Sequence, residues 1–310
     1  MPCFHHQLAI PMPGKTRNGK TPYKFVGKAS NYWTRYKGVQ GLKIMPCRQC
    51  IGCRLERSRQ WATRLMHETK FHSGAIFLTL TYSDEMLPKN RSLNPSDLTT
   101  FIKDLRARND YYGKEKIKYF AVGEYGDATN RPHYHLALFG SYDCRSPESI
   151  PEEPARSGDR QFSHPDFSAV WDKGLHRYSE LTFESAAYVA RYCLKKISGA
   201  KQETHYGERV PEFQRNSNGL GKGHFDAWKN DIYPSDQVVL PGRGAFLPPP
   251  YYDRLLEKVD PALFAQVKKR RIEEQEKITT KSEFHAFVNE ALREGEVRKL
   301  VTEQTLIRSM

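Results

Sequence analysis

The sequence predicts an α+β protein, because predicted strands and predicted helices occur along the same region and two of the strands are placed to pair as an antiparallel hairpin. Segments 75–82, 116–126 and 131–139 are apolar and rich in β-branched and aromatic residues, which is typical of strands. Segments 54–72, 97–109 and 183–198 have the apolar spacing or the alanine-rich composition of helices. Because only a short polar turn separates 116–126 from 131–139, we expect these two strands to pair as a hairpin.

Three regions follow from the composition along the chain. Residues 1–70 form a basic N-terminal segment with a cysteine cluster, which we expect to pack on the rest. Residues 71–200 hold the predicted strands and helices of the core. Residues 201–310 begin with a stretch rich in Gly, Pro and Asn and end in two helix-like stretches, so we expect an irregular extension followed by C-terminal helices. Segment 141–165 is polar and rich in proline, which indicates a surface loop.

The net charge of +13 is concentrated at the N-terminal end. Residues 1–70 contain 14 Lys and Arg but only two acidic residues. Aromatic residues are interleaved with them: Tyr23, Phe25, Tyr32, Trp33 and Tyr36. Basic and aromatic residues together favour a polyanion with bases that can stack, and thus a nucleic acid, over a basic tail that merely aids solubility. No apolar run is long enough for a membrane helix and no signal peptide is evident, so we expect a protein that is neither secreted nor bound to a membrane.

Two histidines in the third predicted strand suggest a metal site. His133 and His135 are two residues apart, so their side chains lie on the same face of the strand. Glu124, nine residues before His133, is expected to lie across from this pair in the hairpin. Two imidazoles and one carboxylate can hold Mg²⁺ or Mn²⁺ with positions left open for phosphate oxygens. Asp84 or Glu85 remain alternatives for the carboxylate, and solvent-facing histidines without a metal remain the simpler interpretation.

Two tyrosines in the last predicted helix of the core suggest a nucleophile. Tyr188 and Tyr192 are four residues apart, so their phenols lie on one helix face. Arg191, Lys195 and Lys196 supply positive charge nearby. A phenol has a pKa of about 10 and is a weak nucleophile, but nearby cations and a metal-polarised phosphate make it an effective one. Without the histidine strand, two tyrosines at this spacing would be read as ordinary core residues.

The run CRQCIGC suggests a second, structural metal site. Cys47, Cys50 and Cys53 offer three thiolates, whereas structural zinc takes four ligands. Cys3 is the expected fourth ligand, and the alternatives are His5, His6 and His67. Three reduced thiols at a tight turn are the simpler interpretation, and an iron–sulfur cluster is a further alternative.

The order of FLTLTY, RPHYHLALF and YVARYCLKK resembles the three motifs of rolling-circle replication initiators, the two-tyrosine endonucleases with a His–hydrophobe–His (HUH) motif. The wider segments PCRQCIGCRLERSRQW, YFAVGEYG and FESAAYVARYC look like the replication initiator of gokushoviruses, single-stranded DNA phages of the microvirus family. Tyr134 departs from the usual motif, because an aromatic residue stands where an aliphatic one is usual. The resemblance covers residues 1–255, and the last 55 residues add nothing to it.

This resemblance implies an RRM-like core of about five antiparallel strands with helices behind them. It implies that Tyr188 and Tyr192 nick and rejoin the plus strand at a phage origin through a 5′-phosphotyrosine link. Histidines 133 and 135 would bind Mg²⁺ or Mn²⁺, and Lys195 would steer the phosphate. The expected DNA contacts are Arg131, Arg191 and Lys196. The expected partners are single-stranded and supercoiled origin DNA with a helicase and polymerase of the bacterial host, in whose cytoplasm the protein would act.

Two other functions stay open from the sequence. The first is a non-catalytic protein that binds single-stranded DNA or RNA through the basic segment and a zinc module. The second is a transposase of the same HUH class, which we consider weaker because such transposases tend to be shorter and to use one tyrosine.

Overall fold

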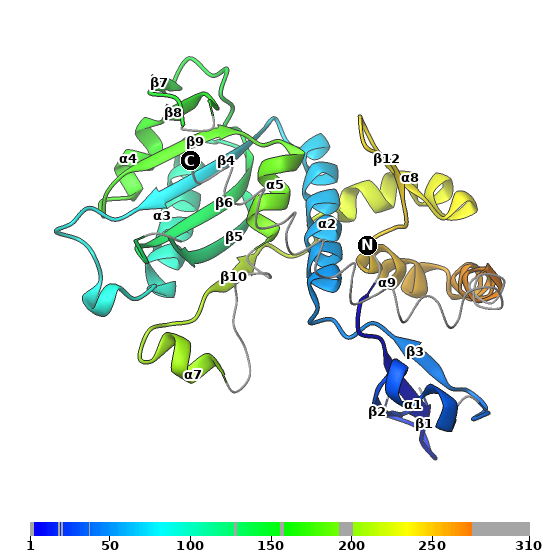
Figure 1. The fold of residues 1–310 in the computed structure, drawn as a ribbon. Coiled ribbons are helices and arrows are strands. Elements are labelled where there is room, and N and C mark those ends of the chain that lie inside the picture. Colours follow the sequence, from blue (N-terminus) through cyan, green and yellow to red (C-terminus); the bar gives the residue numbers. More distant parts are fainter. Residues whose placement is uncertain are drawn as a thin grey trace. The chain divides into compact units, whose positions relative to one another are not determined.

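The computed structural model describes residues 3–17, 19, 21–36, 38–126, 129–155, 158–191 and 201–274 (Figure 1). The chain divides into two compact units. The first unit comprises Met1–Arg57 and Lys268–Met310, and the second comprises Ser58–Val267. The helix α2 (Ile51–Glu68) runs across the boundary between them.

The first unit contains a small antiparallel sheet with strand order β2-β1-β3. Its elements are β1 (Gln7–Pro11), β2 (Tyr23–Lys28), the helix α1 (Ala29–Tyr36) and β3 (Lys43–Met45). A separate small cluster of buried residues comprises Cys3, Phe4 and Cys50, with the side chains of Cys47 and Cys53 packed against it. Because this cluster consists mostly of thiols, little apolar surface is available to stabilise the unit.

The second unit is built on a seven-stranded antiparallel sheet with strand order β10-β5-β6-β4-β9-β8-β7 (Figure 1). The strands in chain order are β4 (Gly74–Thr81), β5 (Lys118–Tyr125), β6 (Pro132–Gly140), β7 (Ile150–Glu152), β8 (Gln161–Ser163), β9 (His176–Glu180) and β10 (Phe213–Asn216). The long strands β4, β5 and β6 form the centre, and the short strands lie towards the two edges.

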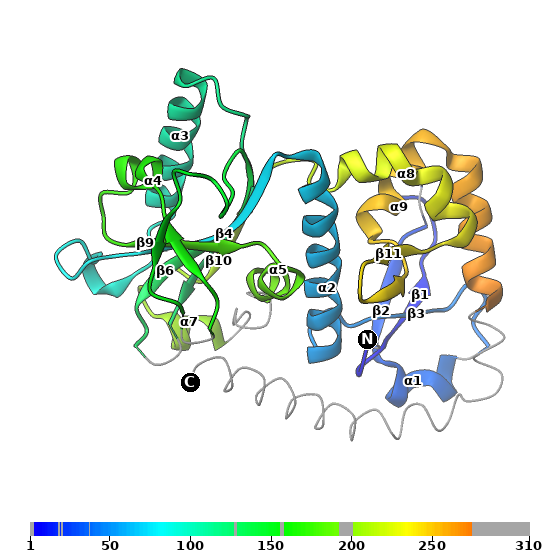
Figure 2. The ribbon, with the colours of Figure 1, turned by 90° about the horizontal axis from the view of Figure 1, so that it is seen from above.

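Helices cover both faces of this sheet (Figure 2). The helices α3 (Pro95–Tyr111) and α4 (Pro165–Val170) lie on one face, where Phe101 and Phe167 pack with Tyr134 and Leu136 of β6. The helix α5 (Phe183–Ala190) and the second half of α2 lie on the other face, where the apolar core continues with Phe120, Val122, Ala137 and Phe139. The alternation of strand residues explains this division, because neighbours along β5 and β6 point to opposite faces.

Local sequence sets the beginnings of the two helices that matter most for the sheet. The side chain of Asn94 accepts a hydrogen bond from the backbone N–H of Ser96, so Asn94 is the N-cap of α3. Thr182 and Ser185 form a reciprocal capping box at the start of α5. Each cap satisfies backbone groups that a helix end would otherwise leave without partners. The start of α5, two residues after β9 ends, is therefore well defined.

The remaining elements of the second unit are α7 (Lys201–Tyr206), α8 (Lys222–Ser235), the β11 (Val238–Leu240) and β12 (Gly244–Phe246) hairpin, and α9 (Pro250–Val259). Glu68 of α2 joins this region to the sheet: its carboxylate accepts hydrogen bonds from Lys118 Nζ and from the N–H of Gly221, both at 2.6 Å. Burial opposes ionisation of Glu68, but hydrogen bonds from His72, Lys118 and Gly221 outweigh it and lower its pKa to about 2.

Two buried histidines also hold α2 against α8 and α9. The rings of His67 and His224 stack with centroids 3.5 Å apart, and His67 Nδ1 lies 2.8 Å from the Tyr252 hydroxyl. Burial lowers the pKa of His67 to about 3 and that of His224 to about 4, with a further contribution to His67 from its partner. Both rings are therefore neutral near pH 7.

The predicted α+β class is confirmed, and the hairpin of β5 and β6 is present. The sheet is larger than the five strands that the resemblance implied. Segment 141–165 was expected to be a loop, but it contributes the edge strands β7 and β8. Segment 201–250 was expected to be irregular, but it contributes α7, β10, α8 and the β11–β12 hairpin. Among the described residues, no helix combines the length and apolar character that crossing a membrane requires.

Candidate active site

The hairpin of β5 and β6 brings Glu124, His133 and His135 together. Glu124 is the direct cross-strand partner of His133, and His135 lies two residues further along the same face of β6. One ligand atom from each of the three side chains lies within 4.8 Å of the other two. Glu124 is 1% exposed and His135 is 8% exposed, so both hold their positions inside the fold. This arrangement has the ligand types and the spacing that a divalent cation requires.

Hydrogen bonds orient both imidazoles. His133 Nδ1 lies 3.0 Å from the carbonyl oxygen of Arg131, and a carbonyl can only accept, so this bond requires a proton on Nδ1. In the neutral ring, Nε2 then carries the lone pair for a metal. His135 Nδ1 lies 2.9 Å from the hydroxyl of Thr79, its cross-strand partner on β4. Phe77 stacks on the same imidazole, with ring centroids 5.2 Å apart.

Tyr188 of α5 lies against this histidine. Its ring meets His135 edge-on with centroids 5.3 Å apart, and it meets Phe77 in the same way at 6.1 Å. The side chain of Tyr188 is only partly buried, whereas Val189 and Ala190 beside it belong to the core. The phenol therefore stands on the same side of the sheet as the three candidate ligands. Tyr192, the second predicted tyrosine, lies outside the described residues.

The predicted cationic residues have different positions. Arg131 forms an ion pair with Asp84 at 2.6 Å and donates to the carbonyl oxygen of Tyr82 at 2.8 Å. Asp84 was one of the alternative metal ligands, but its carboxylate is directed to Arg131 in this ion pair and not to the histidines. Glu85, the other alternative, is exposed in the loop after β4. Arg191 is the C-cap of α5, one turn after Tyr188. Lys195 and Lys196 lie outside the described residues.

The structure groups Cys3 with the cysteine run, as the sequence predicted. The Sγ atoms of Cys3, Cys47, Cys50 and Cys53 all lie within 4.8 Å of one another. The described cysteines are free thiols, and the sulfur atoms of Cys3 and Cys50 are 3.9 Å apart. A disulfide needs about 2.05 Å between sulfurs, whereas a tetrahedron with Zn–S bonds of about 2.3 Å puts its sulfurs roughly 3.8 Å apart. The cluster therefore has the dimensions of a zinc site.

Backbone N–H groups point at these sulfur atoms. The N–H of Cys47 donates to Cys3 Sγ at 3.2 Å, and the N–H groups of Phe4 and Cys50 donate to Cys50 Sγ and Cys47 Sγ, each at 3.3 Å. Such donors stabilise thiolates. Burial nevertheless raises the pKa of Cys3 to about 11 and raises that of Cys53 as well, whereas the pKa of Cys47 is lowered because hydrogen bonds outweigh its burial. Four thiolates this close together would repel one another, and a bound cation would offset that repulsion. The alternative ligand His67 is instead stacked on His224 in the second unit.

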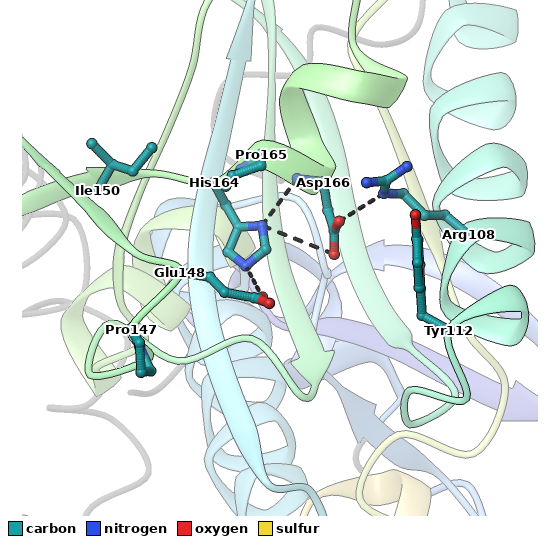
Figure 3. A pocket seen from close by; sticks show the side chains of 8 residues that line it. All are labelled: Arg108, Tyr112, Pro147, Glu148, Ile150, His164, Pro165 and Asp166. Carbon is teal, nitrogen blue, oxygen red and sulfur yellow. Dashed lines mark hydrogen bonds and ion pairs between the residues drawn. The ribbon is translucent and has the colours of Figure 1, made fainter.

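A third group of potential ligands lines a pocket beside α3 and α4, in the layer that covers the other face of the sheet (Figure 3). His164 Nε2 lies 3.0 Å from Glu148, and Asp166 accepts hydrogen bonds from Arg108 at 2.6 Å and Lys114 at 2.7 Å. Burial raises the pKa of Asp166, but these two cations outweigh it and lower the pKa to about 2. Because its charge is already neutralised by two cations, this carboxylate is a poor metal ligand.

Comparisons with known proteins agree with the motifs. Residues 75–197 match the protein family described as Replication-associated protein ORF2/G2P. The chain is 39% identical over 222 residues to Replication-associated protein ORF2 of Spiroplasma virus 4, a match that covers 69% of this chain and 68% of that protein. The chain belongs to the replication-associated proteins of small phages.

Two other phage replication-associated proteins extend this likeness. The VP4 protein of Bdellovibrio phage phiMH2K is 31% identical over 252 residues, covering 79% of this chain and 78% of that protein. The ORF4 protein of Chlamydia phage 1 is 32% identical over 221 residues, covering 69% of this chain and 54% of that protein. No solved structure matches. The predicted kinship with phage replication initiators is thus confirmed, and the protein acts in phage replication.

Sequence reasoning missed two residues of this site. Thr79 and Phe77 lie on β4 and contact His135 from the neighbouring strand. In the sequence, both belong to the run FLTLTY, where Thr and Phe simply look like good strand residues. Their position in the strand was the available signal. Once β4 is known to pair with β6, Thr79 is the partner of His135, and Phe77, two residues earlier, lies on the same face.

Proposed function

We propose that this protein is a metal-dependent endonuclease that nicks and rejoins the plus strand of a phage origin to begin and end rolling-circle replication. The contact between Tyr188 and His135 carries this proposal, because it puts a phenol beside three candidate metal ligands on one face of the sheet. The membership of a phage replication family supports it from an independent direction.

The roles of the residues follow from their chemistry. A divalent ion held by Glu124, His133 and His135 would polarise the scissile phosphate and leave positions open for its oxygens. The phenol of Tyr188 gives up its proton and its oxygen attacks phosphorus, the bond from phosphorus to the 3′ oxygen breaks, and that oxygen takes up a proton and leaves as a 3′-OH. The 5′ phosphate stays on the tyrosine, which conserves the bond energy for rejoining.

Two tyrosine nucleophiles would allow the reaction to run twice. While the first tyrosine holds the 5′ end, the free 3′-OH primes synthesis of a new strand. The second tyrosine then attacks the regenerated origin, and the 3′-OH released there attacks the first phosphotyrosine and closes a circle. We assign these roles to Tyr188 and Tyr192, with Lys195 steering the phosphate and Arg131, Arg191 and Lys196 contacting DNA, as the family resemblance implies.

We further propose that Cys3, Cys47, Cys50 and Cys53 hold one structural zinc ion. The spacing of the sulfur atoms and the N–H donors aimed at them support this assignment. Zinc bound there would tie the N-terminus to the start of α2 and would supply stability that the small first unit cannot draw from apolar burial.

Covalent trapping tests the nuclease. The protein is incubated with Mn²⁺ and labelled single-stranded oligonucleotides that tile the phage genome, and denaturing gels detect a DNA adduct. Mass spectrometry of the trapped peptide identifies the tyrosine. We expect the wild type to form an adduct, and we expect EDTA or the substitution His135→Ala to prevent it. Among the tyrosine variants, only the Tyr188→Phe/Tyr192→Phe double variant should abolish the adduct. Tyr111→Phe is the matched control, because Tyr111 is 83% exposed on α3.

The same assay separates the proposal from its alternative. A folded protein that binds the oligonucleotides but forms no adduct with any of them would be a non-catalytic DNA-binding protein. An adduct that persists in the double variant would disprove the role of both tyrosines. Each single variant should still form an adduct but fail to release a closed circle, and unimpaired circle closure by both single variants would refute the alternation.

A further inference from the structure

We propose that one face of the three-stranded sheet in the first unit is a binding platform for single-stranded DNA, on which bases stack against Phe25 and Tyr23. This inference goes beyond the proposed cleavage reaction, because the platform lies in a different unit from Tyr188 and uses none of its chemistry. A chain that cannot nick would still bind DNA through it.

The register of the sheet puts the relevant side chains on one face. Phe25 and Lys43 are both cross-strand partners of Ala9, one from each side, and Tyr23 is the partner of Pro11 two residues further along β1. Partners and alternate residues of a sheet share a face. The Nζ of Lys43 lies 4.4 Å from the centre of the Tyr23 ring, which confirms that these two side chains meet across β1.

The other face is occupied by the unit's own helix. Gly27 pairs with Leu8, the neighbour of Ala9 on β1, and therefore belongs to the face opposite Phe25. The pairing register shifts between Leu8 and Ala9, which breaks the usual alternation between residues 25 and 27 of β2. A Cβ atom at Gly27 would lie 2.5 Å from the ring of Tyr32 on α1, so this helix packs directly against β2. Leu8 is fully buried. The sheet thus has one face covered by α1. On the other face Ala9 at the centre is also fully buried, whereas Phe25, Lys28 and Lys43 around it are exposed.

Exposure distinguishes Phe25 from a core residue. Its side chain is 58% exposed, although it stands in a strand of a small unit with little apolar surface to bury. Lys28 and Lys43, which lie on the same face, are also exposed. An exposed ring beside lysines on a strand surface is an arrangement by which proteins hold single strands: the ring stacks on a base and the lysines meet the phosphates.

Charge complementarity identifies the occupant as a nucleic acid. Residues 1–57 contain 11 Lys and Arg and a single acidic residue, Glu56, which gives this part of the chain a formal charge of +10. A duplex would keep its base faces stacked inside and could use only the lysines, whereas a single strand uses both the lysines and the rings. The proposed nicking reaction acts on a DNA strand, so we commit to single-stranded DNA, and this choice of DNA over RNA rests on the proposed function.

Binding measurements without cleavage test this proposal. Fluorescence anisotropy follows a labelled single-stranded 20-mer with the zinc-containing full chain and no added Mg²⁺ or Mn²⁺. We expect Phe25→Ala to bind about 5- to 150-fold more weakly, which is the range for the loss of one base-stacking contact. Lys43→Gln should lower the slope of log affinity against log salt by about 0.7, the value for one phosphate contact on a single strand. Phe25→Tyr should retain affinity.

The controls make failure recognisable. Tyr111→Ala removes a more exposed ring from the other unit and should bind as the wild type does. Circular dichroism and zinc content must match the wild type in each variant, which separates lost contacts from lost folding; Lys43→Gln serves as the second probe if Phe25→Ala fails this check. Unchanged affinity in both folded variants, or equal affinity for an oligonucleotide of abasic sites, would overturn the proposal.

Other outcomes are equally decisive. Binding that favours RNA or duplex over single-stranded DNA overturns our choice of occupant. If Phe25→Ala weakens binding but still forms the adduct at saturating DNA, the platform and the nuclease are separate properties. If no protein forms an adduct but Phe25→Ala still weakens binding, the nuclease proposal fails and this one stands.

Discussion

Replacing Thr79 tests whether the hydrogen bond to His135 prepares the imidazole for metal binding. For Nε2 of neutral His135 to serve as a ligand, Nδ1 must carry the proton, and the hydroxyl of Thr79 at 2.9 Å then accepts it. Thr79→Val removes this acceptor but keeps a β-branched side chain of similar shape in the centre of the sheet. The imidazole would lose its fixed orientation and tautomer without a change in the strand.

The expected magnitude follows from the role of such partners. Removing a group that orients a metal-bound histidine costs about 10- to 100-fold in metal affinity, or roughly 1.4–2.7 kcal/mol. Because His135 is almost fully buried, leaving Nδ1 without its partner should also cost about 1–3 kcal/mol of folding stability. Titration calorimetry with Mn²⁺ measures the first effect, and urea unfolding of the metal-free protein measures the second.

Two variants control for this effect. Thr79→Ser restores the hydroxyl and should recover most of the Mn²⁺ affinity. Thr81 is the strand partner of His133, but its hydroxyl donates to the carbonyl oxygen of Leu175 and not to an imidazole. Thr81→Val should therefore change the Mn²⁺ affinity little. Saturating Mn²⁺ should also restore adduct formation in Thr79→Val. Wild-type Mn²⁺ affinity in a folded Thr79→Val variant, or no recovery in Thr79→Ser, would refute the reasoning.

Two further predictions concern zinc and acid stability. Elemental analysis should find one equivalent of zinc in the wild type and none in Cys53→Ser. Cys144→Ser should keep the zinc, because Cys144 is a free cysteine outside the cluster. A wild-type protein without zinc would contradict the assignment. The lowered pKa values of His67 and His224 favour the folded state above about pH 6.5, and this stability is lost as the pH falls towards 4 and 3. Because of these two histidines, urea unfolding should show a lower free energy of unfolding at pH 5 than at pH 7, and His224→Phe should reduce that difference. Glu68 does not contribute to it, because with a folded pKa of about 2 its stabilising effect is lost only below about pH 4.5. A pH-independent midpoint between 7 and 5 would contradict the histidine account.

The centre of the site was predictable because its geometry is local. The two histidines share a face by strand alternation, and the short connection between β5 and β6 fixes the register that puts Glu124 across from His133. Tyr188 was predictable in position along its helix, but its distance from the histidines depends on how α5 packs on the sheet. The sequence could not provide that distance, because it depends on contacts with Phe77 and the residues of the second core.

The missed elements depend on long-range pairing. The strands β7, β8 and β10 have only three or four residues each, so they lack a recognisable alternation. They form through pairing that the sequence does not show: β10 adds to the longer β5, β8 to the longer β9, and β7 to the equally short β8. Segment 201–250 looked irregular because of its glycines and prolines, yet Gly221 adopts the positive φ that starts α8, and Pro234 falls in the last turn of that helix. The same residues that weaken regular structure in a sequence here mark where elements begin and end.

The place of β10 determines how far the chain can be shortened. This strand lies beside β5, which carries Glu124, but its residues follow the tyrosine helix by more than twenty positions along the chain. A fragment that stopped at residue 200 would keep every predicted catalytic side chain and still leave β5 with an open edge, which invites strand exchange and aggregation. It would also cut the support that Gly221 gives to Glu68. Biochemists who design a minimal nuclease should therefore retain the chain at least through the start of α8.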